Sequence, residues 1–170
     1  MESVKERRGG SELRQFISFT VAQEEYGLEL LRVREVIRVR EITWLPRAPS
    51  FIRGIINLRG DVIPIIDLRE RFGLQAQDAT AMTRVIVVQV EGQLLGMVVD
   101  SASQVVRIPA EQIEQAPLLL GRLSRELVTA VGKIDDRLVA LLDVSAVLGV
   151  GEKRELSRLR GEDSRMRAAR

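Results

Sequence analysis

The stretch FIRGIINLRGDVIPIIDL, from Phe51 to Leu68, consists of two apolar runs separated by the polar residues Arg59-Gly60-Asp61. Each run has the length of a strand and is rich in Ile, a β-branched residue that favours strands. Glycine adopts the positive φ of a tight turn at little cost. The stretch therefore predicts a β-hairpin that turns at Arg59-Gly60. Its tripeptide RGD is interpreted as a coincidence rather than an adhesion signal.

Two residues of this hairpin do not suit a regular strand. Gly54 lies inside the first apolar run, where a glycine often marks a bulge or the close approach of another backbone segment. Pro64 lies in the second run and has no backbone N–H to donate. We therefore expect a close contact at Gly54, and we expect Pro64 to lie on an edge strand or at a bulge.

The same pattern of short apolar runs recurs along the chain and predicts a mainly β protein with short helices. The chain also repeats itself. One constant offset places Gly27 on Gly96, and a second, slightly larger offset places Asp67 on Asp143. We infer two similar halves of about 70 residues, each with too small a core to be stable alone. The halves are therefore expected to pack against each other, with a groove between them.

The charge is distributed unevenly. The chain has 26 Lys and Arg against 24 Asp and Glu, and residues 151–170 alone hold seven basic and four acidic residues. We expect residues 1–12 to be a disordered tail and residues 13–150 to be a folded domain of two repeated halves. Residues 151–170 would then be a basic tail, frayed or helical, of which a solvated extension is favoured. The domain itself lacks the broad positive surface that nucleic-acid binding usually requires.

The sequence contains no His and no Cys. The usual general base near neutral pH, thiol catalysis and the ordinary zinc ligands are therefore missing. Asp67 and Asp143 precede short helical segments and are interpreted as helix N-caps, and Asp135-Asp136 is interpreted as a turn. We predict a protein that is not an enzyme and that holds no metal or cofactor. A hydrolase based on carboxylates is a remote alternative.

The hairpin FIRGIINLRGDVIPIIDLRERFG closely resembles the NLRG hairpin of CheW-type chemotaxis coupling proteins. Three more segments resemble the same family in the same order: FTVAQEEYGLELLRVREVI, RVIVVQVEGQLLGMVVDSASQVVRI and LVTAVGKIDDRLVALLDVSAVL. The likeness extends from Leu13 to about Leu148, with modest departures at Ser101-Ala102 and Ala130. It implies a CheW-like fold of two SH3-like five-stranded β-barrels that pack around a shared core, with short helices.

The resemblance also implies a non-catalytic adaptor that links the cytoplasmic tips of chemoreceptors to the regulatory domain of a CheA-type histidine kinase. Receptor helices would dock in the groove between the barrels, and the kinase would contact barrel ends. The chain shows neither an export signal nor a membrane-spanning run. We therefore expect a cytoplasmic protein, recruited to membrane-associated receptor arrays without inserting into the membrane and without binding nucleic acid.

Two alternatives to this function stay open. The first is the same adaptor role in a different chemosensory pathway, such as surface motility or pili. The second, more remote, is a nucleic-acid-binding β-barrel protein that uses the basic tail. Such a protein needs aromatic side chains on which bases stack, and the chain has only one Trp, one Tyr and four Phe.

The resemblance places functionally sensitive positions of the family on four residues, and two further residues complete the hairpin motif. Together these six form the predicted partner-binding site: Val33, Glu35, Gly54 and Arg59, with Asn57 and Leu58. Arg59 is either a solvated turn residue or a guanidinium that binds carboxylates between the halves. Val33 suits the core as well as it suits a contact. Glu35 is a solvated charge, a contact or the partner of Arg59, in which case the pair would belong to the scaffold. Asp135 takes the place of Arg59 in the second half, and this asymmetry directs the hypothesis to Arg59.

Overall fold

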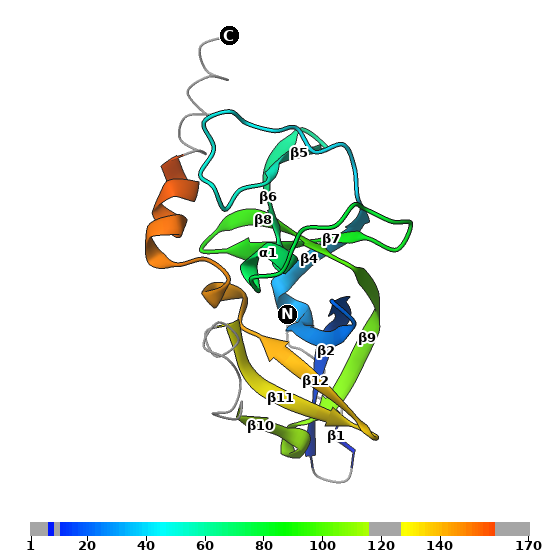
Figure 1. Cartoon of the computed structure of the whole chain (residues 1–170). Coiled ribbons are helices and arrows are strands. Elements are labelled where there is room, and N and C mark those ends of the chain that lie inside the picture. The colour runs from blue at the N-terminus through cyan, green and yellow to red at the C-terminus, as the bar shows by residue number, and fades with distance from the viewer. Residues whose placement is uncertain (1–6, 9–10, 116–126, 159–170) are drawn as a thin grey trace.

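The computed structural model describes residues 7–8, 11–115 and 127–158, which form a mainly β protein with two curled sheets (Figure 1). The first sheet has five strands in the order β4-β7-β8-β6-β5. Its strands are β4 (Val33–Arg38), β5 (Gly54–Leu58), β6 (Asp61–Asp67), β7 (Arg84–Val90) and β8 (Gln93–Val99).

The second sheet has the order β1-β2-β3-β12-β11-β10, and a further strand, β9, pairs with β2. Its strands are β1 (Arg7–Arg8), β2 (Ser11–Val21), β3 (Glu24–Glu29), β9 (Ser101–Pro109), β10 (Ile113–Gln115), β11 (Val128–Ile134) and β12 (Arg137–Leu142). The helical elements are α1 (Leu68–Arg71) and the 3₁₀ helices η1 (Leu30–Arg32), η2 (Ala110–Gln112) and η3 (Val144–Ala146). Residues 150–158 are also helical.

Separate apolar clusters fill the two sheets, and a third cluster joins them. One cluster belongs to the first sheet and contains Ile63 and Val85, and another belongs to the second sheet and contains Phe16. The largest cluster combines residues of both sheets, among them Phe19 of β2 and Met97 of β8. The fold class expected from the sequence is confirmed: two SH3-like barrels lie one above the other in Figure 1 and share a core.

The two halves of the sequence are not the two barrels. β6 pairs in parallel with β8, so that Ile65 lies opposite Gly96, and β12 pairs in parallel with β3, so that Leu141 lies opposite Gly27. Each sheet therefore combines strands from both halves of the sequence. The expectation that two self-contained halves pack against each other is wrong in this respect, because the halves exchange strands.

The repeated glycines explain how the exchanged strands fit. A Cβ on Gly96 would lie 2.4 Å from Ile65 Cδ1, and a Cβ on Gly27 would lie 3.0 Å from Leu141 Cδ2. The bare backbone at each glycine leaves room for the large side chain of the neighbouring strand. At both crossings a glycine thus lies opposite a large aliphatic residue, and the pairing joins the two halves of the sequence within one barrel.

The hairpin turns predicted at Arg59-Gly60 and at Asp135-Asp136 are confirmed, and Glu91-Gly92 forms a turn of the same kind. Arg59 and Gly60 have φ of 51° and 88°, and Glu91 and Gly92 have φ of 49° and 80°. Positive φ at both central residues is typical of the turn that matches the twist of two antiparallel strands. Asp135 has the same φ of 51° as its counterpart Arg59. The repeat therefore preserves the backbone of the turn while the side chain changes.

Of the two expectations for irregular residues of the opening hairpin, the structure confirms one and contradicts the other. The close approach expected at Gly54 is confirmed, since a Cβ there would lie 2.6 Å from the backbone oxygen of Thr43. The expectation for Pro64 is wrong, because β6 lies between β8 and β5 in the interior of the sheet. The proline is tolerated there since the pairing of β6 with β8 covers only Ile65–Asp67.

Both predicted N-caps are present. Asp67 Oδ1 accepts a hydrogen bond of 2.9 Å from the backbone N–H of Arg69, at the start of α1. Asp143 Oδ1 accepts one of 2.9 Å from the backbone N–H of Ser145, at the start of η3. The repeat thus extends to the helical segments that follow β6 and β12.

The folded region extends beyond the expected domain of residues 13–150 at both ends. β1 pairs with the first residues of β2, so residues 7–8 and 11–12 belong to a sheet rather than to a disordered tail. Leu156 lies in the helical residues 150–158 and is buried in the shared core. A solvated extension is therefore wrong for residues 151–158. The remaining parts of both tails, residues 1–6, 9–10 and 159–170, lie outside the described residues.

Candidate functional site

The hairpin turn between β5 and β6 is held rigidly by its own side chains and backbone. Leu58 and Asp61 are opposite each other at the end of the ladder. Asn57 Oδ1 accepts a hydrogen bond of 2.9 Å from the backbone N–H of Gly60 and so closes the turn. Arg59 projects from this turn and is 68% exposed. The hairpin therefore presents a guanidinium on a fixed backbone.

Arg59 forms a forked ion pair with Glu35. Its Nη1 donates to Glu35 Oε1 at 3.2 Å, and its Nη2 donates to Glu35 Oε2. These hydrogen bonds lower the pKa of the Glu35 carboxyl, and the same contact raises the pKa of Arg59. The pairing that the sequence left open is thus present. Both charges stay accessible, so the pair contributes little to stability and can exchange partners.

The ion pair connects the two edges of the first sheet. Glu35 lies on β4 and Arg59 lies at the end of β5, and these are the first and last strands of the order β4-β7-β8-β6-β5. The contact therefore bridges the open end of the curled sheet. The same position places an exposed arginine and an exposed carboxylate side by side, where a partner protein can reach both.

A shallow hollow surrounds this ion pair. It has a volume of about 320 Å³, and its lining combines apolar side chains with charged ones: Arg34, Glu35, Leu58, Arg59, Asp61, Ile63, Val87, Gln89 and Leu94. Arg34 is fixed by a hydrogen bond of 2.8 Å from its Nη2 to Gln89 Oε1. A floor of buried aliphatic side chains with a charged rim is the composition of a protein-binding surface.

The other predicted site residues support this surface from within. Leu58 is buried with an exposure of 4%, and Gly54 is buried against the backbone of Thr43. Val33 is half-buried and packs against the shared core. Glu35 and Arg59 are therefore brought together at the surface, Asn57 shapes the turn beside them, and the remaining three residues hold the framework.

A second arginine–carboxylate pair ties the barrels together. Asp100, between β8 and β9, accepts hydrogen bonds of 2.8 and 2.6 Å from Nε and Nη2 of Arg69 on α1. It also accepts one of 2.8 Å from the backbone N–H of Ala22, in the turn between β2 and β3. The bonds from Arg69, and then the Ala22 N–H, lower the pKa of Asp100. The sequence did not predict this link, since nothing local marks three residues that are far apart in the chain.

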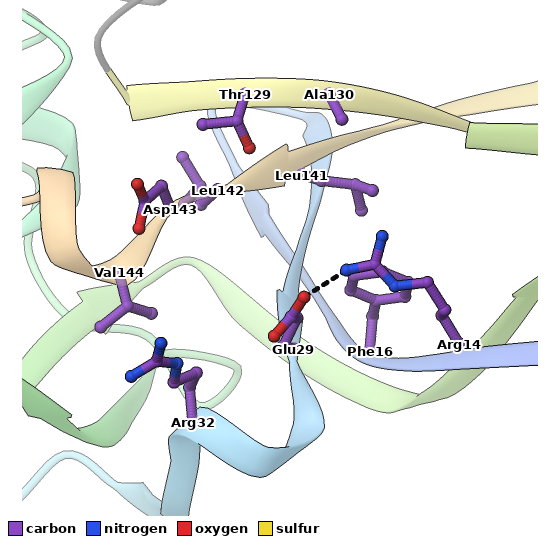
Figure 2. Close-up of a pocket in the computed structure, with 10 residues that line it drawn as sticks. All are labelled: Arg14, Phe16, Glu29, Arg32, Thr129, Ala130, Leu141, Leu142, Asp143 and Val144. Carbon is purple, nitrogen blue, oxygen red and sulfur yellow. Dashed lines mark hydrogen bonds and ion pairs between the residues drawn. The ribbon is translucent and has the colours of Figure 1, made fainter. Parts of the chain in front are cut away.

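A pocket in the second barrel was also missed. This β3–β12 pocket has a volume of about 200 Å³ and is lined by Arg14, Phe16, Glu29, Arg32, Thr129, Ala130, Leu141, Leu142, Asp143 and Val144. Figure 2 shows that Arg14 and Glu29 are joined by an ion pair, while Arg32 and Asp143 lie at the other side of the pocket. The internal repeat was the available signal, because it places Thr129 where the first half has Arg53.

The described residues lack two features, a cluster of metal-binding side chains and a membrane-spanning helix. Residues 7–8, 11–115 and 127–158 contain no group of three or more Asp or Glu side chains that could hold a metal ion. No helix in these same ranges is long and apolar enough to cross a membrane.

Comparisons with known proteins agree on one family. The CheW-like domain model matches residues 15–152. The chain is 36% identical to Chemotaxis protein CheW of Klebsiella aerogenes over 152 residues, which cover 89% of this chain and 92% of the relative. It is 30% identical to Protein FrzA of Myxococcus xanthus, over 85% of this chain and 91% of the relative. The crystal structure of the scaffolding protein TtCheW from Thermoanaerobacter tengcongensis superposes with a TM-score of 0.74 and 34% identity, covering 82% of this chain and 94% of that one.

Proposed function

Since the chain belongs to the CheW-like domain family of chemotaxis scaffold proteins, we propose that it couples chemoreceptors to a CheA-type histidine kinase without performing catalysis. The observation that supports this proposal most directly is the exposed Glu35–Arg59 pair on a rigid hairpin. The pair supplies a planar donor and a carboxylate at fixed positions. A partner with complementary charges can bind to both.

The six residues of the predicted site divide into contacts and supports in this proposal. Glu35, Arg59 and Asn57 make the contacts, since all three reach the surface around the hairpin turn. Gly54 and Leu58 hold the hairpin in register, and Val33 positions the start of β4 against the shared core. A surface of this size binds weakly on its own, so function depends on many copies acting together in an array.

The proposed location of the protein is at membrane-associated receptor arrays. The protein reaches the receptor arrays at the membrane by binding the cytoplasmic tips of the receptors, rather than by inserting a segment of its own. The kinase regulatory domain is its second partner. Two surfaces are required for coupling, and the junction of the two barrels and the exposed hairpin of the first barrel are the proposed pair.

Co-sedimentation tests this function. Purified full-length protein is mixed with receptor-containing membranes and a CheA-type kinase, and the pellet and the kinase activity are measured. We expect the protein to enter the pellet with the kinase and to change its autophosphorylation rate. If it stays in the supernatant and leaves the kinase unchanged, the coupling function is wrong.

The match to FrzA favours a second candidate, which is the same adaptor role in a different chemosensory pathway such as surface motility or pili. The two candidates share the fold and differ in the receptors that are bound. The same co-sedimentation, performed in parallel with receptors of each pathway from the source organism, separates them. Preferential binding to the receptors of a motility or pilus pathway would favour the second candidate.

A further inference from the structure

In the first half of the repeat an arginine binds the carboxylate of the N-cap aspartate, and the second half has no such arginine. Arg53, which directly precedes β5, donates from Nη1 to Asp67 Oδ2 at 2.9 Å and to Glu70 Oε1 at 3.2 Å. Asp67 Oδ1 is already bonded to the backbone N–H of Arg69. Both carboxylate oxygens of Asp67 therefore have donors, and the side chain of Asp67 is only 4% exposed.

In the second half, Thr129 and Asp143 take the places of Arg53 and Asp67. The pairing confirms the equivalence, because Ala130 lies opposite Leu141 as Gly54 lies opposite Ile65. Asp143 Oδ1 is bonded to the backbone N–H of Ser145. No side chain in the described parts of the chain donates to its other oxygen, and the short side chain of Thr129 provides no cation.

The β3–β12 pocket occupies the place of the missing arginine. Its lining includes the buried side chains of Leu142 and Val144, the chain neighbours of Asp143, against which the methylene groups of a long side chain can pack. Glu29 is neutralised by Arg14. Arg32 is exposed and has no ion-pair partner among the described residues. Figure 2 shows the carboxylate of Asp143 and the guanidinium of Arg32 at the same side of this pocket.

We propose that the β3–β12 pocket receives an arginine side chain of a partner protein, whose guanidinium binds Asp143 as Arg53 binds Asp67. Arginine suits the pocket better than lysine, because a guanidinium already fills this role beside Asp67 and holds its donors in a fixed plane. The Ser145 N–H already orients the carboxylate, so little ordering is needed on binding. Arg32 faces a carboxylate on the same partner segment. The partner surface is therefore one that carries an arginine beside an acidic residue.

This inference does not depend on the adaptor function, and its test uses no receptor or kinase. N-acetyl-L-arginine amide is titrated into isotope-labelled full-length protein while the backbone amide NMR shifts of Asp143, Val144 and Ser145 are followed. We expect saturable shifts at these residues. N-acetyl-L-citrulline amide has a similar shape without the charge, so it should bind at least about tenfold more weakly.

Three variants, one of them a control, test whether the arginine compound binds in this pocket. Asp143→Asn removes the charge and keeps an acceptor for the Ser145 N–H, so arginine binding should weaken at least about tenfold. Thr129→Arg supplies the missing guanidinium from the chain itself and should abolish the titration. Asp135→Asn changes an exposed acid in the β11–β12 turn and should leave it unchanged. Spectra that are unchanged elsewhere show that each variant is folded.

Three results would each contradict binding of an arginine side chain in the β3–β12 pocket. Equal shifts with the arginine and citrulline compounds would show that the pocket does not select a cation. Shifts that persist in both Asp143→Asn and Thr129→Arg would place the binding elsewhere on the surface. Absence of any shift in the wild-type protein would show that the pocket does not take this side chain.

Discussion

The hairpin turns at residues 57–61 and 133–137 share one backbone and differ in their ionic contacts. In the first, Arg59 reaches Glu35 on the opposite edge strand of the sheet. In the second, Asp135 replaces Arg59, and Arg137 Nε lies 3.2 Å from Glu25 Oε2 on the neighbouring strand β3. Duplication therefore preserves the turn, whereas the arginine–carboxylate fork at the rim belongs to one barrel. The turn therefore forms without the fork, which is consistent with the binding role proposed for Arg59 and Glu35.

The largest expected effect on folding compares Gly54 with its counterpart Ala130. Gly54→Ala should lower the free energy of unfolding by about 1–3 kcal/mol, since the added methyl meets a backbone oxygen that cannot easily move. Ala130→Gly is the matched control and should cost about 1 kcal/mol or less. Urea unfolding measures both. If Gly54→Ala keeps full stability and loses partner binding, Gly54 is itself a contact.

An intermediate effect on stability is expected when the pH is lowered until Asp100 becomes protonated. The counterpart of Asp100 in the first half is the exposed Leu31, whose apolar side chain makes no such ion pair across the barrels. The bonds from Arg69 and Ala22 hold the pKa of Asp100 below its unfolded value. Its contribution to stability is therefore complete above about pH 4 and is lost as the pH falls through the lower folded value.

Asp100→Asn provides the test of this acid dependence. The variant should be less stable than the wild type near neutral pH, and the difference between the two should narrow below about pH 4. Thermal melts at a series of pH values measure it. A difference that does not change with pH would mean that the charge of Asp100 is not what joins the barrels.

The smallest effect on folding is expected at the fork. Arg59→Ala should change the melting temperature by no more than about 2 °C, since the ion pair is exposed. The same variant should weaken co-sedimentation with the receptor and kinase. Arg137→Ala, in the corresponding region of the second barrel, is the control and should bind normally. A large loss of stability in Arg59→Ala would show that the fork holds the barrel closed.

Much of the local structure could be predicted from the sequence. The positive-φ turns at Arg59-Gly60 and Asp135, the N-caps at Asp67 and Asp143, and the close contact at Gly54 all follow from the conformations that these residue types favour. The family resemblance supplied the two-barrel fold and the six candidate residues. Their roles in binding stay predictions.

Other features could not be read locally. Pro64 is expected on an edge strand or at a bulge, because proline has no N–H to donate to a neighbouring strand. It lies instead on the interior strand β6, whose pairing with β8 begins one residue later, at Ile65. Residues 151–158 were expected to be solvated because they are rich in charge, yet Leu156 reaches the shared core. In both cases a contact with a distant segment outweighs the local preference.

The sequence by itself determined the strands, the turns, the caps and the internal repeat, because each depends on residues that are close together in the chain. It also determined that chemistry based on His or Cys is absent. Only the tertiary structure decided that the halves exchange strands, that Arg59 meets Glu35, and that an open pocket stands where Arg53 fills its counterpart. These features depend on distances between segments that only the packing of two whole barrels brings together.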